Sequence, residues 1–455
     1  MSAVFFYKNI FNVLMPNVRS TFFSFVFLAG LVCSSLLNAS NLIDVYHEAL
    51  EKDAQYQSAR AAYQAAQEKI VQGRAGLLPN INFSFTRQAQ EVDTTLGPAV
   101  TIQNRGIVIA ATQPIVRFEN FIIYTQSKTQ VSQAESQFVI AAQDLILRVA
   151  QAYFDVLDAQ IDVEVAEAQK VAILKQLEQA KRNFEVGVAT IVDTNEAQAR
   201  FDLTLSQEIA ARNALEINKR ALQGIINRFP EQLAHTNEIV SDLPVLRYGS
   251  MDEWVKVAEE QNFTLKVQQA AYDLASKEVR RMWSQHLPTV DLVAQYSDQT
   301  GVGAQFTGRG IDLTSQSIGV QVNVPIFQGF GTQSKVREAI ANQEKAQHDL
   351  EDIRRATVLQ VRQQYLNVTN GIAQVNALKQ ALISSKTQLD STILGQEVGV
   401  RTEVDVLNAQ QQFYSARRDL TKAYHSYLMS RLRLSAEAGE LDEEVLQQIN
   451  DMLQG

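Results

Sequence analysis

The chain of 455 residues carries one pattern twice, and this duplication restricts its fold more than any other feature of the sequence. The triplet Val-Gly-Val at 186–188 returns unchanged at 398–400, and the pair Leu-Pro at 78–79 returns at 287–288. Sequence that repeats at a nearly constant spacing builds repeated structural units. We therefore predict a first repeat at 40–230, a linker at 231–249, a second repeat at 250–441 and a C-terminal tail at 442–455.

Each repeat contains a very long stretch without proline. No proline occurs in 115–229 or in 326–455, and an interior proline would cost a helix roughly 3 kcal/mol. The tract 119–186 carries apolar residues at helical spacing, and 331–398 is its counterpart in the second repeat. A helix of that length is about 100 Å long, which predicts a coiled coil rather than a globular core. Each long helix is expected to turn at Gly187 or Gly399 and to be followed by an antiparallel helix from about Thr190 or Thr402.

Ahead of each long helix, a segment framed by prolines changes from helical to two-residue periodicity. Apolar residues occupy the even positions from 318 to 324, for example, and this alternation is typical of a strand with one apolar face. We predict two hairpins with strands of about ten residues, at 79–116 with a polar loop at 97–106, and at 288–325 with a loop at 299–310. One helix is expected before each hairpin, from Asn41 to about Gly76 and from Ser250 to about Gln285.

The predicted strands have the length and alternation of transmembrane β-strands. A soluble hairpin packed on the helices is the alternative that the pattern leaves open. Four strands do not close a barrel, for which eight is about the minimum, and lipid does not tolerate an open sheet edge. If the strands span a membrane, several chains must therefore share one barrel. A trimer would contribute twelve strands and twelve long helices.

The segment 1–39 differs from the rest of the chain. It carries Lys8 and Arg19 but no acidic residue, and an apolar run at 22–32 follows. This order predicts a secretory signal peptide that is cut after Ala39. Eleven apolar residues are too few for a transmembrane helix, which needs about 20. We expect an exported protein.

Charge and composition exclude several function classes. The formal net charge of −9 does not favour nucleic-acid binding, which needs a basic surface. Cys33 is the only cysteine, so disulfides within the chain and cysteine-based zinc sites are excluded. Its lipidation is disfavoured because Val32 precedes it. The five histidines show no short metal-ligand spacing, and no nucleotide or hydrolase motif occurs. We therefore predict no enzyme activity, no metal and no cofactor.

Several short runs stand out by their order and spacing along the two repeats. The runs are Leu-Leu-Pro at 77–79, His-Leu-Pro at 286–288, Val-Pro-Ile-Phe at 324–327, Ala-Tyr-Phe-Asp-Val-Leu at 152–157, Asn-Phe-Glu-Val-Gly-Val at 183–188, 397–407, and Ala-Tyr-His-Ser-Tyr-Leu at 423–428. With these runs in this order and duplication, the chain resembles the TolC-type outer-membrane channel proteins of Gram-negative bacteria, over about 40–445.

The resemblance implies a fold and a function. The fold is a homotrimer with mixed α and β structure: a twelve-stranded β-barrel in outer-membrane lipid continues into an antiparallel α-helical barrel across the periplasm, with an equatorial belt that includes 231–249. The function is that of a passive exit duct for drugs or secreted polypeptides. Its partners would be a periplasmic adaptor (membrane fusion) protein and an inner-membrane pump of the RND, ABC or MFS type.

Two interpretations apply to the acidic residues after the helix turns. From the residues alone, Thr190 with Asp193 and Thr402 with Asp405 are capping boxes, in which threonine and acid stabilise a helix start. The resemblance implies a gate at the periplasmic end, in which Arg401 bridges Asp193 and Asp405 faces the pore. The chain departs from the family at two positions, because Gln396 replaces a tyrosine of the gate network and Asn408 replaces a second pore-facing acid.

The turns themselves are candidate adaptor-docking sites, because they are small, apolar and expose their backbone. The alternative is that they are only tight turns. The residues concerned are Val186, Gly187, Val188, Val398, Gly399 and Val400. Two other functions remain open, namely a periplasmic coiled-coil adaptor and an exported scaffold of an export complex without a pore. An adaptor would not repeat its strand pair, and this chain does.

Overall fold

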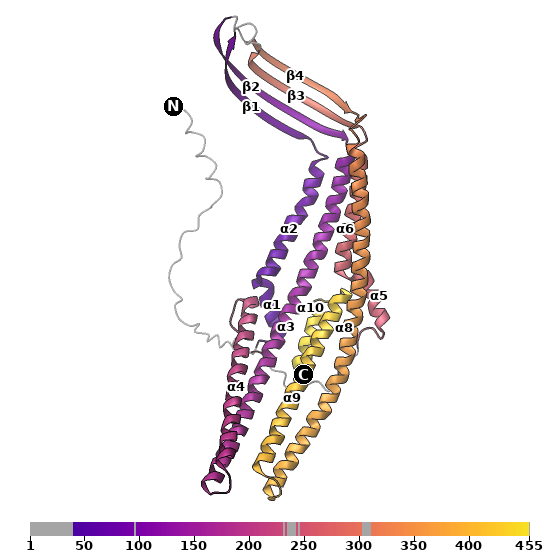
Figure 1. Ribbon diagram of the computed structural model, residues 1–455. Coiled ribbons are helices and arrows are strands. Elements are labelled where there is room, and N and C mark those ends of the chain that lie inside the picture. Colours follow the sequence, from indigo (N-terminus) through magenta and orange to yellow (C-terminus); the bar gives the residue numbers. More distant parts are fainter. Residues whose placement is uncertain are drawn as a thin grey trace, which may run out of the picture. The chain divides into compact units, whose positions relative to one another are not determined.

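The computed structural model describes residues 40–94, 97–230, 233, 243, 246–302 and 311–454 (Figure 1). The predicted signal peptide at 1–39 and most of the linker at 231–249 lie outside these residues. Among the described helices, none combines the length and the hydropathy that a transmembrane span requires.

The predicted long helices are present in both repeats. The helix α3 has 68 residues and α8 has 67, and each turns into a shorter antiparallel helix, α4 or α9. The helix α3 also packs against α9, so the two repeats form one continuous layer of helices (Figure 1). The prediction of two coiled-coil hairpins is confirmed. The bounds are α3 Phe118–Glu185, α4 Ile191–Ile226, α8 Gly331–Glu397 and α9 Glu403–Ala438.

The prediction of one uninterrupted helix before each hairpin is wrong. The break falls at Asp53 in the first repeat and at Asn262 in the second, where ψ is 118° and 126°. Each side chain accepts a hydrogen bond from a backbone N–H three residues later, at 2.7 Å and 3.0 Å, and so caps a new helix. The four helices are α1 Leu42–Lys52, α2 Ala54–Ala75, α5 Met251–Gln261 and α6 Phe263–Ser284.

The strands form one antiparallel sheet in the order β1-β2-β3-β4. They have 15, 20, 14 and 13 residues, so the predicted length of ten was too short. The first predicted loop, 97–106, belongs to β2, because its backbone continues the ladder with β1 as far as the pair Thr94 and Gly97. Of the second, 303–310 lies outside the described residues. The bounds are β1 Asn80–Thr94, β2 Gly97–Val116, β3 Thr289–Val302 and β4 Ile311–Asn323.

The main core lies where the two repeats meet. Tyr153 and Phe154 of α3 are buried with Tyr424 and Leu428 of α9. The helix α10, Glu443–Gln454, occupies the segment expected to be a tail, and its Leu446 is fully buried in the same cluster. This core joins the first repeat to the second and leaves the strands outside it.

Candidate functional site

The strand register places the alternating apolar residues of all four strands on one face of the sheet. Phe83 pairs with Ile109, Ile109 pairs with Tyr296, and Leu292 pairs with Val320. Directly paired residues point to the same side of a sheet. We call this surface the apolar face; it comprises Ile81, Phe83, Phe85, Ile107, Ile109, Ala111, Val290, Leu292, Ala294, Tyr296, Ile318, Val320 and Val322.

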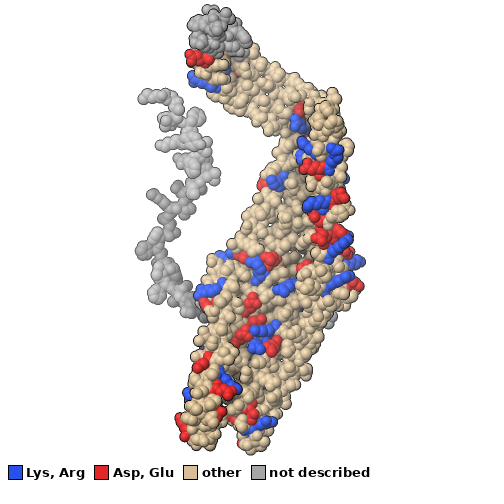
Figure 2. All heavy atoms as spheres, in the orientation of Figure 1, with Lys and Arg blue, Asp and Glu red and all other residues tan. Residues whose placement is uncertain are grey.

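The apolar face is exposed in the single chain. Ile318 is 78% exposed, Val320 65% and Phe83 67%, so these side chains are not packed on the helices of their own chain. The soluble-hairpin alternative is therefore wrong. Figure 2 shows that charged side chains spread over the visible side of the helices, whereas the visible side of the sheet has almost none between its ends. A contiguous exposed apolar surface indicates contact with lipid or another protein.

The sheet also has two open edges. The strands β1 and β4 are the outer strands of the order, so each has only one neighbouring strand. An unpaired edge leaves backbone N–H and C=O groups without partners, which is costly in lipid. The sheet therefore needs β1 and β4 to pair with strands outside this chain.

At the other end of the long helices lie the two turns (Figure 1). Gly187 and Gly399 both have φ of +79°, a left-handed conformation that glycine adopts without strain. The valines around them are strongly exposed: Val186 is 73%, Val188 75%, Val398 67% and Val400 78% exposed. The six residues predicted to dock an adaptor thus form two similar apolar tips.

Both acidic residues after the turns form capping boxes. The Asp193 N–H donates to Thr190 Oγ1 at 3.3 Å, while the Thr190 N–H donates to Asp193 Oδ2 at 2.8 Å. Thr402 and Asp405 repeat this arrangement at 3.2 Å and 2.9 Å. The backbone N–H of each threonine holds the pKa of the carboxyl below its usual value. The capping interpretation is therefore correct for both residues.

The structure does not join Arg401 to Asp193 within one chain. In the described part of the chain, Arg401 makes no ion pair, and its charge adds only a minor contribution that lowers the pKa of Asp405. Asp193 belongs to α4, which is separated from α9 by α3 in the helix layer. If the two residues meet, the contact must therefore involve a second copy.

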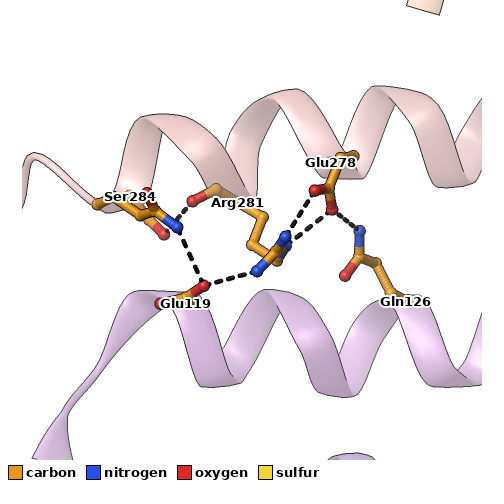
Figure 3. A network of polar contacts seen from close by, with 6 residues as sticks. Glu119, Gln126, Glu278, Arg281 and Ser284 are labelled. Atoms are coloured by element: carbon orange, nitrogen blue, oxygen red, sulfur yellow. Dashed lines mark hydrogen bonds and ion pairs between the residues drawn. The ribbon is translucent and has the colours of Figure 1, made fainter. Parts of the chain in front are cut away.

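The structure also contains a polar network between α3 and α6 that no sequence pattern predicted (Figure 3). Arg281 contacts Glu119 at 2.7 Å and Glu278 at 2.6 Å, and Gln126 donates to Glu278 at 3.0 Å. The hydrogen bond from Arg281 holds the pKa of Glu278 below its usual value. The spacing of Glu278 and Arg281 on one helix was the only local signal, because their other partners lie more than 150 residues away in the sequence. The network therefore links α3 of the first repeat to α6 of the second repeat, near the sheet.

A second ion pair strengthens the same region. Arg117, just before α3, donates two hydrogen bonds to Asp291 of β3, at 2.9 Å and 2.6 Å. Asp291 is 7% exposed. A bidentate pair of this kind fixes geometry as well as charge, so it sets the position of the strands on the helices. No cluster of three metal-binding side chains lies among the described residues.

These features together define a membrane channel subunit: an exposed apolar face, open strand edges and a long coiled coil with two apolar tips. The comparisons with known proteins agree. The sequence profile of the family described as "Outer membrane efflux protein" matches residues 45–228 and 254–440, one segment in each repeat. The chain belongs to this family. It is an outer-membrane exit channel of the Gram-negative cell envelope, and its long helices are the periplasmic part.

Individual relatives support the same assignment. The chain is 33% identical to outer membrane protein TolC of Vibrio cholerae over 92% of this chain and 94% of that protein. It is also 33% identical to alkaline protease secretion protein AprF of Pseudomonas aeruginosa, over 90% and 86%. The solved structure of the Campylobacter jejuni CmeC outer membrane channel matches with a TM-score of 0.74 at 15% identity, covering 96% of this chain and 98% of that one. These relatives are channel and transport proteins, and the resemblance seen in the sequence is confirmed.

Proposed function

We propose that three copies of this chain form a passive duct, through which drugs or secreted polypeptides pass from an inner-membrane pump and its periplasmic adaptor to the exterior. The observation that carries the proposal is the sheet with an apolar face and two open edges, because only further copies supply strands that close it. Relatives named for protease secretion support a polypeptide cargo. The chain itself is proposed to have no catalytic role and to need no metal or cofactor.

The helices provide a second argument for closure by identical copies. In the part of the helix layer that ends at the two turns, the order of the helices is α4-α3-α9-α8. The helices α4 and α8 are therefore the outer helices of this part. Both carry large exposed apolar side chains, for example Leu203 at 63% and Ile209 at 62% on α4, and Leu359 at 67% on α8. Packing α4 of one copy on α8 of the next would cover them while β1 pairs with β4.

A deletion strain tests the function. We expect such a strain to become sensitive to drugs, to lose a secreted protein from its medium, or both, and the wild-type chain to restore the loss. The purified protein should migrate as a heat-labile trimer in detergent. A folded monomer that never enters membranes would contradict the proposal and would favour the adaptor or scaffold alternatives.

We further propose that the turns form the gate. Because α8 of one copy would adjoin α4 of the next, Arg401 would face Asp193 of the neighbouring copy. The cap uses Asp193 Oδ2, so Oδ1 is available to accept from the guanidinium. Asp405 would place three carboxylates around the entrance. Docking of a pump and adaptor would move the turns outward and break these contacts.

Replacing Arg401 by alanine is expected to favour the open state. An exposed ion pair is worth about 0–1 kcal/mol, so three copies bias the equilibrium by up to about 3 kcal/mol, and we expect about a tenfold rise in open occupancy. Single-channel recording in planar bilayers measures it. Arg182→Ala is the matched control, since Arg182 lies in α3 near the tip of the first repeat and is 77% exposed in a pair with Glu178. Unchanged conductance and closed-state occupancy in Arg401→Ala would contradict the gate.

The docking role of the tips can be separated from their role as turns. Asparagine tolerates the left-handed conformation, and the chain already has Asn227 at φ of 54°. No atom lies within 4 Å of a Cβ built on Gly187, so Gly187→Asn should leave the turn intact. We expect it to lower the yield of cross-links between the tip and the hairpin of a periplasmic adaptor several-fold. Cross-linking at the wild-type level would mean that the glycine serves the turn alone.

A further inference from the structure

We propose that Gly395 is a positioning residue for the gate. Because glycine has no side chain, it leaves the space in which Cβ and Cγ of Arg401 lie. This inference rests on the proposed role of Arg401. It adds a residue that sequence patterns alone do not mark, since Gly395 lies inside α8, before the turn begins.

The contact between the two residues is close. The N–H groups of Val400 and Arg401 donate to the carbonyl oxygen of Gly395, at 2.8 Å and 3.0 Å. A Cβ built on Gly395 would lie 2.7 Å from Cγ of Arg401 and 3.4 Å from its Cβ. Cγ is at the base of the side chain, so it does not yield as the far end of a flexible chain would. Any side chain at 395 therefore forces Arg401 to leave its orientation.

The first repeat shows that the turn itself does not require this glycine. Asn183 occupies the matching position, 212 residues earlier. The N–H groups of Val188 and Ala189 donate to the Asn183 carbonyl oxygen at 2.9 Å and 3.2 Å, so the backbone pattern is the same. Ala189 stands where the second repeat has Arg401, and it has no stem to accommodate.

Glycine in a helix is otherwise unfavourable. Gly395 does not have a positive φ, and alanine is the better helix former at an ordinary helical position. Backbone conformation therefore gives no reason for glycine at 395. The two repeats differ at both positions together, with asparagine and alanine in one and glycine and arginine in the other. This pairing points to a steric function that concerns Arg401.

The predicted phenotype of Gly395→Ala is an open gate with the arginine still present. The guanidinium keeps its charge but is displaced from its partner, so we expect the open occupancy to rise about as much as in Arg401→Ala, about tenfold. The double variant should equal Arg401→Ala, because an alanine at 401 has no Cγ to displace. Asn183→Ala, the matched change in the first repeat, should behave as the wild type.

Single-channel recording of the purified full-length protein in planar bilayers, with thermal unfolding of each variant, tests the inference. Gly395→Ala should not unfold at a lower temperature than the wild type. Wild-type gating in Gly395→Ala beside an open Arg401→Ala would overturn the inference and leave the gate intact. Additive effects in the double variant, or a lowered unfolding temperature, would also overturn it. Wild-type gating in Arg401→Ala would instead reject the gate, and the inference with it.

Discussion

Replacing Val320 by arginine is expected to prevent assembly of the channel in the outer membrane. Val320 lies on the apolar face, paired with Leu292, and is 65% exposed. A lipid-facing arginine costs a β-barrel about 2–4 kcal/mol near the bilayer midplane. Three copies of the substitution in one trimer would cost about 6–12 kcal/mol on the same scale. We expect the heat-labile trimer to disappear from outer-membrane fractions.

The neighbouring residue provides the matched control for this prediction. Gln321 lies in the same strand and points to the opposite face of the sheet. An arginine at 321 would face the interior of the duct, where water solvates it. Gln321→Arg should therefore assemble at nearly the wild-type level and change only the ion selectivity of the pore. Equal assembly of the two variants would show that the apolar face does not contact lipid.

Replacing Asp53 by alanine is expected to destabilise the helical part strongly. Asp53 is 4% exposed, and both of its oxygens accept hydrogen bonds from Arg148, at 2.9 Å and 3.0 Å. It also caps α2 by accepting from the N–H of Tyr56 at 2.7 Å. Removing one partner of a buried ion pair typically costs about 3–5 kcal/mol. Urea unfolding followed by circular dichroism would measure the loss.

The second repeat offers a control that lacks the ion pair. Asn262 breaks the helix at the matching position, 209 residues later, and caps α6 through the N–H of Leu265 at 3.0 Å. It also donates to the carbonyl oxygen of Glu437 at 2.8 Å. Asn262→Ala should therefore cost about 1–3 kcal/mol, as loss of a cap and a buried hydrogen bond does. An equal or larger loss than in Asp53→Ala would show that the ion pair adds nothing.

The same residue predicts a dependence of stability on pH. The hydrogen bond from Arg148 holds the pKa of Asp53 below its usual value. The stabilisation is therefore fully present above the ordinary aspartate pKa of about 4 and is lost as the pH falls through the lowered pKa of the folded state. Asp53→Asn keeps a capping oxygen but cannot titrate. The difference in unfolding free energy between wild type and Asp53→Asn should shrink between pH 7 and pH 3; a constant difference would contradict this assignment.

Local patterns in the sequence were sufficient to predict much of the fold. Absence of proline and helical spacing predicted long helices at 119–186 and 331–398, where the structure has helices of 68 and 67 residues. The alternation at 318–324 predicted a strand with one apolar face. Gly187 and Gly399 were predicted as turns, and Thr190 and Thr402 as helix starts. Each of these depends on interactions within a few residues, so the local sequence contains the information. At Asp53 two local signals compete, because helical spacing favours one continuous helix and the aspartate favours a helix start. The structure has the break, with Asp53 as the cap of α2.

Contacts between distant segments were decided only by the tertiary structure. The register of four strands put the apolar residues on one face, and the pairs of Arg117 with Asp291 and of Arg281 with Glu119 join residues 174 and 162 positions apart. The helix order likewise separates Asp193 from Arg401 within one chain. Such contacts depend on how whole elements are placed in space, and neither hydrophobic period nor capping motif specifies that placement. The sequence by itself therefore determined the elements and their duplication, and the packing of the elements determined which side chains meet.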